Sequence, residues 1–283
     1  MQKEPMTGRV CVVTGATRGI GRATAEGLAR LGATVVLVSR RLEDGRRVSR
    51  EIAVGGRQPD VVPADLSSQA SIRHAAEELS RRYPAIHVLI NNAGIITRQR
   101  EVTVDGFEMQ FAVNHLAYFL LTQLLLDCLR AGVPSRIINV SSGVHGAATL
   151  DFEDLQGERS YRANRAYGQS KLANILFTYE LARRLDGTGI TANCLHPGVI
   201  GTKLLADYMG APVGGGALAR TFGATPERGA ATTIYLATSP EVEGVTGQYF
   251  EDKRARRSSR ESYDEAAARR LWDISVRLTG LSS

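Results

Sequence analysis

Short apolar runs alternate along the chain with longer segments in which apolar residues recur every three or four positions. Seven short runs are rich in β-branched residues and cover residues 9–14, 34–38, 60–62, 86–90, 136–140, 190–195 and 245–250. Helical periodicity marks the segments 20–31, 67–83, 107–129, 166–185 and 226–238. Because the short runs are apolar on both faces, they predict strands of a parallel sheet that is covered on both sides.

The alternation of strands and helices predicts a single α/β domain that spans residues 1–283. Right-handed crossovers would form a doubly wound parallel β-sheet of about seven strands, flanked by helices on both faces. No internal repeat or linker divides the chain. Three stretches break the rhythm: an insert at about 143–164, a glycine-rich lid at about 203–223 and a C-terminal helical tail at about 260–280.

A glycine-rich turn links the first predicted strand to the first helix. Gly15, Gly19 and Gly21 permit a tight turn and close approach of the backbone to a ligand. The N–H groups and the dipole of the following helix favour an anion. We therefore expect a phosphate-binding turn, with Thr17, Arg18 and Ile20 at its intervening positions; a turn without a ligand is the alternative.

The spacing of these glycines resembles that of the short-chain dehydrogenase/reductase family. Further motifs of the family follow in the same order: Asp65-Leu66, Asn91-Asn92-Ala93-Gly94, Asn114, Ser142, Tyr167 with Lys171, and Pro197-Gly198. The resemblance covers about residues 7–250. It implies a Rossmann-type fold, a nicotinamide cofactor and a hydride transfer.

The end of the second strand indicates NADP(H). An NAD enzyme usually carries a carboxylate there for the ribose hydroxyls, whereas this chain has Ser39, Arg40 and Arg41. Arg40 can form a guanidinium fork on a 2′-phosphate, and Arg18 can reach the same group from the glycine turn. The alternative is that both arginines are only solvated surface residues.

The remaining cofactor contacts follow from the resemblance alone. It places Asp65 and Leu66 at the adenine, and the segment Asn91 to Gly94, with Asn92 and Ala93, at the adenosine. At the nicotinamide it places Pro197, Gly198, Val199 and Thr202. Asp65 could instead, or as well, cap the helix that starts near Ser67.

The spacing of Tyr167 and Lys171 puts both side chains on one face of a helix. A phenol has a pKa of about 10, and a nearby ammonium together with a positive nicotinamide would lower it. Tyr167 could then exchange a proton with a substrate oxygen that Ser142 holds. The resemblance further implies that Asn114 orders a water leading to Lys171, and that Lys171 binds the nicotinamide ribose.

Three histidines, His115, His145 and His196, lie beside motif residues. They lack metal-ligand spacing, and the chain has no Gly-x-Ser-x-Gly elbow, so we expect packing or loop roles and no metal site. Cys11, Cys128 and Cys194 are too few and too scattered for a disulfide framework, and we expect them to be buried thiols in a reducing, cytoplasmic setting.

The unusual segments bear on the substrate. Ser142 and Tyr167 are 25 positions apart, and the insert between them resembles the branch of retinol dehydrogenases and light-dependent protochlorophyllide reductases. No membrane anchor is expected from the sequence, which weakens retinol as the natural substrate. The apolar lid favours a hydrophobic carbonyl or alcohol, although a plain surface loop is the alternative.

Charge changes this picture little. The net charge is +6, and the one dense basic cluster, residues 253–257, has no interleaved aromatics, so a solvated loop is favoured over nucleic-acid binding. The sequence thus predicts an NADP(H)-dependent oxidoreductase of hydrophobic small molecules, as a possible homodimer or tetramer. The alternatives are an NADP-binding redox sensor without turnover and a light-driven reduction of a ring double bond.

Overall fold

The computed structural model describes residues 4–201, 203–208 and 224–282 of the 283-residue chain. These residues form one sheet in the order β3-β2-β1-β4-β5-β6-β7-β8, in which only β8 is antiparallel to its neighbour. The strands are β1 (Val10–Thr14), β2 (Thr34–Ser39), β3 (Asp60–Pro63), β4 (Val88–Asn91), β5 (Ser135–Val140), β6 (Ile190–His196), β7 (Tyr249–Glu251) and β8 (Arg254–Arg256). The predicted doubly wound α/β fold is confirmed, with eight strands instead of about seven.

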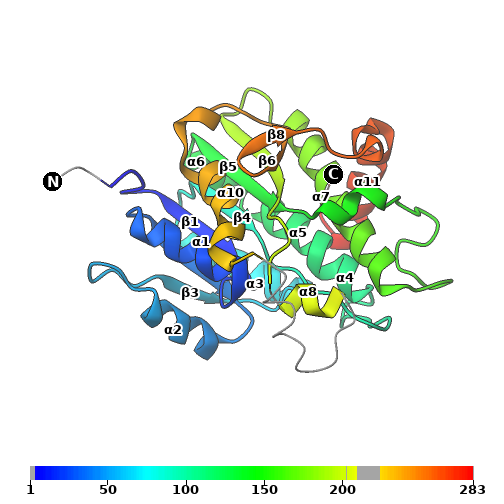
Figure 1. Ribbon diagram of the computed structural model, residues 1–283, viewed down its shortest axis with the longest axis horizontal. Helices are drawn as coiled ribbons and strands as arrows, with labels where there is room; N and C mark the ends of the chain where they lie inside the picture. Colours follow the sequence, from blue (N-terminus) through cyan, green and yellow to red (C-terminus); the bar gives the residue numbers. More distant parts are fainter. Residues whose placement is uncertain (1–3, 202, 209–223, 283) are drawn as a thin grey trace.

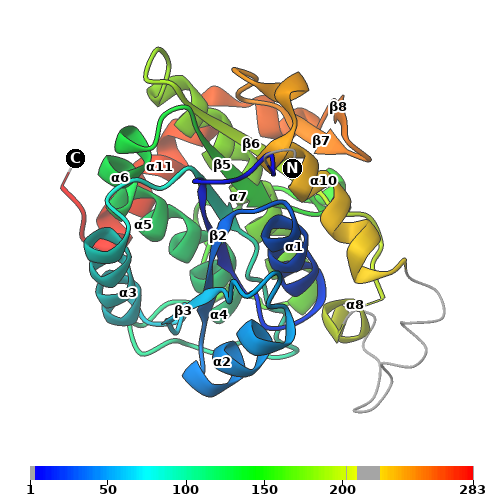
Figure 2. The same ribbon diagram turned by 90° about the vertical axis from the view of Figure 1, so that its left-hand side faces the viewer.

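Helices cover both faces of this sheet (Figures 1 and 2). The α-helices are α1 (Gly19–Arg30), α2 (Leu42–Glu51), α3 (Gln69–Arg82), α4 (Met109–Phe111), α5 (Ala117–Leu124), α6 (Leu126–Ala131), α7 (Ala163–Arg184), α8 (Lys203–Tyr208), α10 (Pro226–Thr238) and α11 (Glu265–Thr279). Shorter turns are the π-helical η1 (Ala112–Leu116) and the 3₁₀ turns η2 (Gly143–Ala147), η3 (Pro240–Val242) and η4 (Arg260–Tyr263). Figure 2 shows α1 and α10 on one side of the sheet and α3, α5 and α11 on the other.

Alternate residues of the central strands feed two separate cores. Val12 and Val36 pack with α3, α5 and α7, whereas Cys11 and Val13 pack with α1, α2 and α10. This period of two on doubly buried strands explains why the sequence shows continuous apolar runs instead of an alternation of apolar and polar residues.

The last helix, α11, packs against α7 and completes the core on that side. The Trp272 ring lies 5.0 Å from Phe119 and 6.0 Å from Phe177, measured between ring centroids. Helix α11, the sheet, α4 and η1 together enclose α7 so fully that the sixteen consecutive residues from Tyr167 to Ala182 are all buried. The predicted helical tail is therefore part of the main body.

Three elements differ from the sequence prediction. The basic cluster expected as a loop contains β8, because Asp252 and Lys253 adopt positive φ angles (47° and 61°) and close a tight hairpin. The residues of β8 are exposed, so the sequence has no apolar run there that would have predicted a strand. The segment expected as one helix from 107 to 129 is divided by the π-turn η1 and again at Leu125. Helix α2 was not predicted.

The carboxyl ends of the parallel strands meet along one edge of the sheet. The crossover direction reverses between β1 and β4, and at such a reversal an open crevice forms outside the strand ends. The glycine turn follows β1, Asn92 follows β4 and Ser141 follows β5, so three motifs separated widely in sequence converge there. Within the described ranges, no helix is both long and apolar enough to cross a bilayer.

Candidate active site

The glycine turn after β1 needs glycine for reasons visible in the structure. Gly15 and Gly19 have positive φ angles of 65° and 54°, which side chains disfavour. A Cβ at Gly15 would lie 2.8 Å from Ala93 Cα, and one at Gly21 would overlap Asn92 Nδ2. The turn therefore packs directly on the segment that follows β4. Arg18 caps α1 without a side-chain hydrogen bond, so no side chain there occupies the first N–H groups of the helix.

Thr14 fastens the segment after β4 to this turn. Its hydroxyl accepts hydrogen bonds from the backbone N–H of Asn92 (2.9 Å) and of Ala93 (3.1 Å). Asn92 Nδ2 donates to Thr14 O at 2.9 Å. The side chain of Asn91 points the other way and is fully buried, where it donates to Thr122 Oγ1 and Asn139 Oδ1. The expectation that Asn91 lines the adenosine side is therefore corrected: it supports the sheet from within.

The end of β2 presents cationic side chains at the same edge. Arg18 and Arg40 are exposed, and neither forms an ion pair with another residue that the structure describes. Ser39 is buried and donates to Arg41 O at 3.1 Å, so its hydroxyl holds the turn into α2. This arrangement leaves two guanidinium groups free to meet an anion.

Asp65 lies in the loop after β3, where its Oδ1 accepts from Ser67 N at 2.9 Å and from Ser67 Oγ at 2.7 Å. The N-cap of α3 is Ser68, whose hydroxyl accepts from Ser71 N. The alternative that Asp65 caps this helix is therefore wrong. Leu66, next to it, is partly buried against the core.

Helix α7 and the end of β5 bring Ser142, Tyr167 and Lys171 together. Tyr167 and Lys171 are buried, with 6% and 2% of their surfaces exposed, and Lys171 Nζ lies 5.7 Å from the centre of the Tyr167 ring. Lys171 Nζ donates to Val140 O at 3.0 Å, two residues before Ser142. The Ser142 hydroxyl lies close enough to that of Tyr167 to act on its pKa. The three predicted residues thus form one cluster.

Asn114 completes the wall beside Lys171. Its Oδ1 accepts from Ile95 N at 2.9 Å, while its Nδ2 donates to Ile95 O and to Ser170 Oγ, both at 3.0 Å. A Cβ at Gly94 would lie 3.5 Å from Lys171 Nζ and 3.6 Å from Asn114 Oδ1. The side chain of Asn114 therefore clamps the segment after β4 against α7.

Sequence reasoning missed several residues that shape this cluster. Tyr118 is buried, donates to Ala93 O at 2.7 Å, and its ring centre lies 5.7 Å from Lys171 Nζ. Ser141 Oγ donates to Lys171 O at 2.7 Å, and Ser170 Oγ donates to Tyr167 O at 2.8 Å. The only sequence signal was that the two serines adjoin motif residues.

Burial dominates the electrostatics of the cluster. It lowers the pKa of Lys171 to about 7, and no acidic group among the described residues opposes this shift. Burial raises the pKa of Tyr167 well above its usual value, although the nearby Ser142 hydroxyl acts against the rise. The sequence-based expectation of a lowered Tyr167 pKa therefore does not hold for the protein alone. The phenol is protonated at neutral pH.

The buried lysine predicts a pH-dependent effect on stability. Because its pKa is depressed, folded Lys171 binds fewer protons than the unfolded lysine between pH 7 and 10.5. The group therefore costs stability in full below pH 7, and this cost disappears as the pH rises through that window. We expect Lys171→Met to be most stable relative to the wild type at pH 7, with the gap narrowing by pH 9.5.

Urea unfolding of the cofactor-free protein at the two pH values measures this gap, and its narrowing is the expected result. Lys253→Met, which replaces an exposed lysine, serves as the control and should show no such trend. An equal gap for Lys171→Met at both pH values would contradict the shifted pKa.

The nicotinamide side of the edge follows β6. Gly198 has a positive φ of 88°, and the exposed Val199 forms a backbone hydrogen bond with Ala224, which closes the base of the predicted lid. Pro197 is half-buried beside them. Thr202 and most of the lid, residues 209–223, lie outside the described residues. Helix α8 places the Tyr208 ring 5.9 Å from that of Tyr167.

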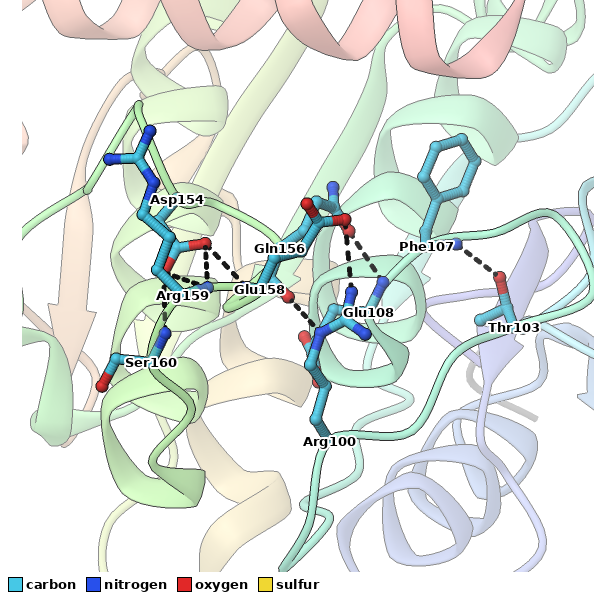
Figure 3. Close-up of polar contacts among 9 residues, drawn as sticks. All are labelled: Arg100, Thr103, Phe107, Glu108, Asp154, Gln156, Glu158, Arg159 and Ser160. Carbon is cyan, nitrogen blue, oxygen red and sulfur yellow. Dashed lines mark hydrogen bonds and ion pairs between the residues drawn. The ribbon is translucent and has the colours of Figure 1, made fainter.

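A polar network joins the insert between Ser142 and α7 to the segment that precedes α4 (Figure 3). Arg100 Nε donates to Gln156 O at 2.8 Å, and Glu108 N donates to Gln156 Oε1 at 2.7 Å. The Asp154 carboxylate accepts backbone N–H groups from residues 158–160, which closes the loop on itself. Tyr161 Oη accepts from Gln110 Nε2 at 2.7 Å. The insert is therefore an ordered wall.

The side chains of His115 and His145 make hydrogen bonds within the fold. His115 is buried, and its Nε2 lies 2.9 Å from Ser275 Oγ on α11; burial lowers its pKa to about 3. His145 contacts Ser142, as described below, and His196 lies against Gly143. Among the residues described, no group of three or more His, Cys, Asp or Glu side chains could hold a metal ion. The cysteines Cys11, Cys128 and Cys194 are buried free thiols, as predicted.

Comparisons with known proteins agree with this geometry. The short chain dehydrogenase profile matches residues 9–210. Retinol dehydrogenase 14 of Mus musculus is 46% identical, over 98% of this chain and 87% of its own. The crystal structure of an uncharacterized protein from Mycobacterium paratuberculosis has 35% identity and a TM-score of 0.80, covering 98% of this chain and 95% of that one.

A short chain dehydrogenase from Escherichia coli CFT073, solved in complex with NADPH, has 26% identity and a TM-score of 0.72, and covers 90% of this chain and 100% of that one. Fold, motif order and full-length similarity coincide. The chain therefore belongs to the short-chain dehydrogenase/reductase family of nicotinamide-dependent oxidoreductases, in its retinol dehydrogenase-like branch.

Proposed function

We propose that the protein is an NADP(H)-dependent oxidoreductase that interconverts a carbonyl and an alcohol in a hydrophobic small molecule. One observation carries the proposal: Ser142 and Tyr167 lie together beside the buried Lys171, at the sheet edge that also holds the glycine turn. A proton donor, a second hydroxyl for the substrate oxygen and a cation near the cofactor are what a carbonyl reduction requires.

The residues at the edge fit a dinucleotide. The first N–H groups of α1 have no side-chain cap, and a side chain at Gly94 would fill the space beside Lys171. When bound, NADPH supplies the hydride. The residues that would hold it are Gly15, Thr17, Arg18, Gly19, Ile20, Gly21, Ser39, Arg40, Arg41, Asp65, Leu66, Asn92, Ala93, Gly94, Tyr167, Lys171, Pro197, Gly198, Val199 and Thr202.

In this proposal Tyr167 is the general acid for reduction. Its raised pKa keeps the phenol protonated, which is the form that donates to a developing alkoxide. Ser142 Oγ holds the substrate oxygen, and Lys171 would bind the nicotinamide ribose. Because the Asn114 side chain is occupied by Ile95 and Ser170, Asn114 fixes the wall beside Lys171.

The preference for NADP(H) is supported by the charge at the end of β2. Arg18 and Arg40 are exposed, have no acidic partner among the described residues, and would bind the 2′-phosphate of the adenosine ribose. An NADPH complex of the Escherichia coli relative is in line with this choice.

An aromatic wall beside the reacting hydroxyl supports a hydrophobic substrate. The Tyr208 ring lies 5.9 Å from that of Tyr167. The apolar residues of the insert, Leu150, Phe152 and Leu155, pack in the cluster formed with α7 and α11. The relatives named for retinol make retinaldehyde one candidate among long apolar aldehydes.

The test is an assay with NADPH and with NADH, in which absorbance monitors oxidation of the cofactor. The carbonyl compounds are long-chain aldehydes, retinaldehyde, bulky ketones and small polar carbonyls. We expect NADPH oxidation with the apolar aldehydes or ketones, and at least roughly tenfold weaker use of NADH, the equivalent of about 1.4 kcal/mol. Tight NADPH binding without consumption by any carbonyl would instead identify a cofactor-binding regulator.

A further inference from the structure

His145 joins the main chain at Ser142 to a distant part of the fold. It lies in η2 with 5% of its surface exposed, and its Nδ1 is 2.7 Å from Ser142 O. Its Nε2 is 3.1 Å from Ser259 N. Because a backbone N–H can only donate, Nε2 is the acceptor and the ring proton is on Nδ1, which donates to Ser142 O. Both ring nitrogens are therefore used, in one tautomer.

The hydrogen bond from His145 holds the main chain of Ser142, whose side chain is otherwise held weakly. The Ser142 hydroxyl accepts only a long bond, 3.5 Å, from Val144 N among backbone groups. The Ser142 carbonyl accepts two bonds from His145, one from the ring and one from the backbone N–H at 3.2 Å. The placement of the hydroxyl beside Tyr167 thus depends on a main chain that His145 fixes.

The segment that contains Ser259, the second partner of His145, is itself held by several contacts. Ser258, next to Ser259, binds Tyr179 Oη of α7 at 2.7 Å and Ser262 Oγ at 2.6 Å. Tyr179 stacks on Tyr263 with ring centres 5.4 Å apart. The segment 258–263 is therefore anchored on the same helix that carries Tyr167. His145 thus links the main chain at Ser142 to a segment that is held on the helix of Tyr167.

We propose that His145 is a positioning residue for the reaction: its Nδ1–H holds the Ser142 carbonyl so that the Ser142 hydroxyl stays beside Tyr167, and Ser259 braces the ring through Nε2. The inference rests on the proposed function, because it assigns Ser142 a part in that reaction. Small displacements of a reacting group lower turnover sharply without affecting remote binding contacts.

Two isosteric variants separate the two ring nitrogens. Asparagine places its amide nitrogen near the position of Nδ1, whereas glutamine places its amide near that of Nε2. Both variants lose the same packing on the Tyr249 ring, whose centre is 4.9 Å from that of His145. We expect His145→Gln to lower kcat at least about tenfold with the KM for NADPH unchanged. His145→Asn should restore kcat to within about threefold of the wild type.

The matched controls are His74→Asn and His74→Gln, at an exposed histidine of α3, which should not change kcat. In a Ser142→Ala background, His145→Gln should lower kcat no further, because the group that it positions is gone. Urea unfolding of each variant shows which losses come from stability. Equal kcat in the Asn and Gln variants, or an additive loss in the double variant, would overturn the positioning role.

Ser142→Ala alone separates this inference from the proposed function. A large loss of turnover in Ser142→Ala, with full activity in both His145 variants, rejects only the role of His145. Unchanged turnover in Ser142→Ala rejects the role of Ser142 in the proposed function, and the positioning role with it.

Discussion

Replacing Tyr167 by phenylalanine is expected to lower turnover by at least about 100-fold, the lower range for loss of a general acid. The ring stays in place, so its contact with the Tyr208 ring, and the Lys171 Nζ that lies 5.7 Å from its centre, are retained. Only the hydroxyl beside Ser142 is lost. Affinity for NADPH, measured by fluorescence titration, should therefore remain within about threefold of the wild type.

Tyr235→Phe is the matched control, because the Tyr235 hydroxyl bonds to Glu241 at the surface, remote from the site. It should leave both turnover and NADPH binding unchanged. Undiminished turnover in Tyr167→Phe would remove Tyr167 from the mechanism, and a parallel loss of cofactor binding would assign it to the cofactor instead.

Replacing Arg40 by alanine is expected to weaken NADPH binding roughly 10- to 70-fold and to leave NADH binding nearly unchanged. A guanidinium fork on the 2′-phosphate forms charge-assisted hydrogen bonds, which solvent reduces to about 1.5–2.5 kcal/mol overall at this exposed position. Each 1.4 kcal/mol corresponds to a factor of ten in affinity. Isothermal titration with both cofactors gives the two affinities directly.

Arg50→Ala, at an exposed position in the last turn of α2, should alter neither affinity. Arg18→Ala should act in the same direction as Arg40→Ala, and the double variant should show less than the sum because both residues would contact one phosphate. Added salt should erode the wild-type preference more than that of the variant. Equal weakening of both cofactors would mean that Arg40 supports the adenosine or the fold.

The fold was predictable wherever burial leaves a periodic pattern. The strand and helix around the glycine turn end within about two residues of their predicted limits, because the strand is buried on both faces and the buried residues of the helix recur every three or four positions. Helix α2 escaped prediction because it buries little besides Val48 and is otherwise charged. The π-turn at Ala112–Leu116 escaped because all five of its side chains are buried, so no polar face marks the break.

The site was predictable in part for a related reason. Residue type and spacing pick out Tyr167, Lys171 and Ser142, since side-chain chemistry is their role. Tyr118 and His145 act on the backbone carbonyls of Ala93 and Ser142, and such partners leave no trace in spacing. The direction of the Tyr167 pKa was also beyond reach, because it depends on how completely the fold excludes water around that ring.

The position of α11 near the end of the chain has a consequence for folding during synthesis on the ribosome. Helix α7, which carries Tyr167, ends at Arg184, and α11 begins only at Glu265. The helix that packs on α7 is therefore synthesised long after α7 itself. At roughly 5–20 residues per second, the interval is on the order of ten seconds. Throughout it, the aromatic side chains that Trp272 later covers stay uncovered on the nascent chain. The helix that carries Tyr167 and Lys171 thus acquires its full packing only after α11 has been synthesised.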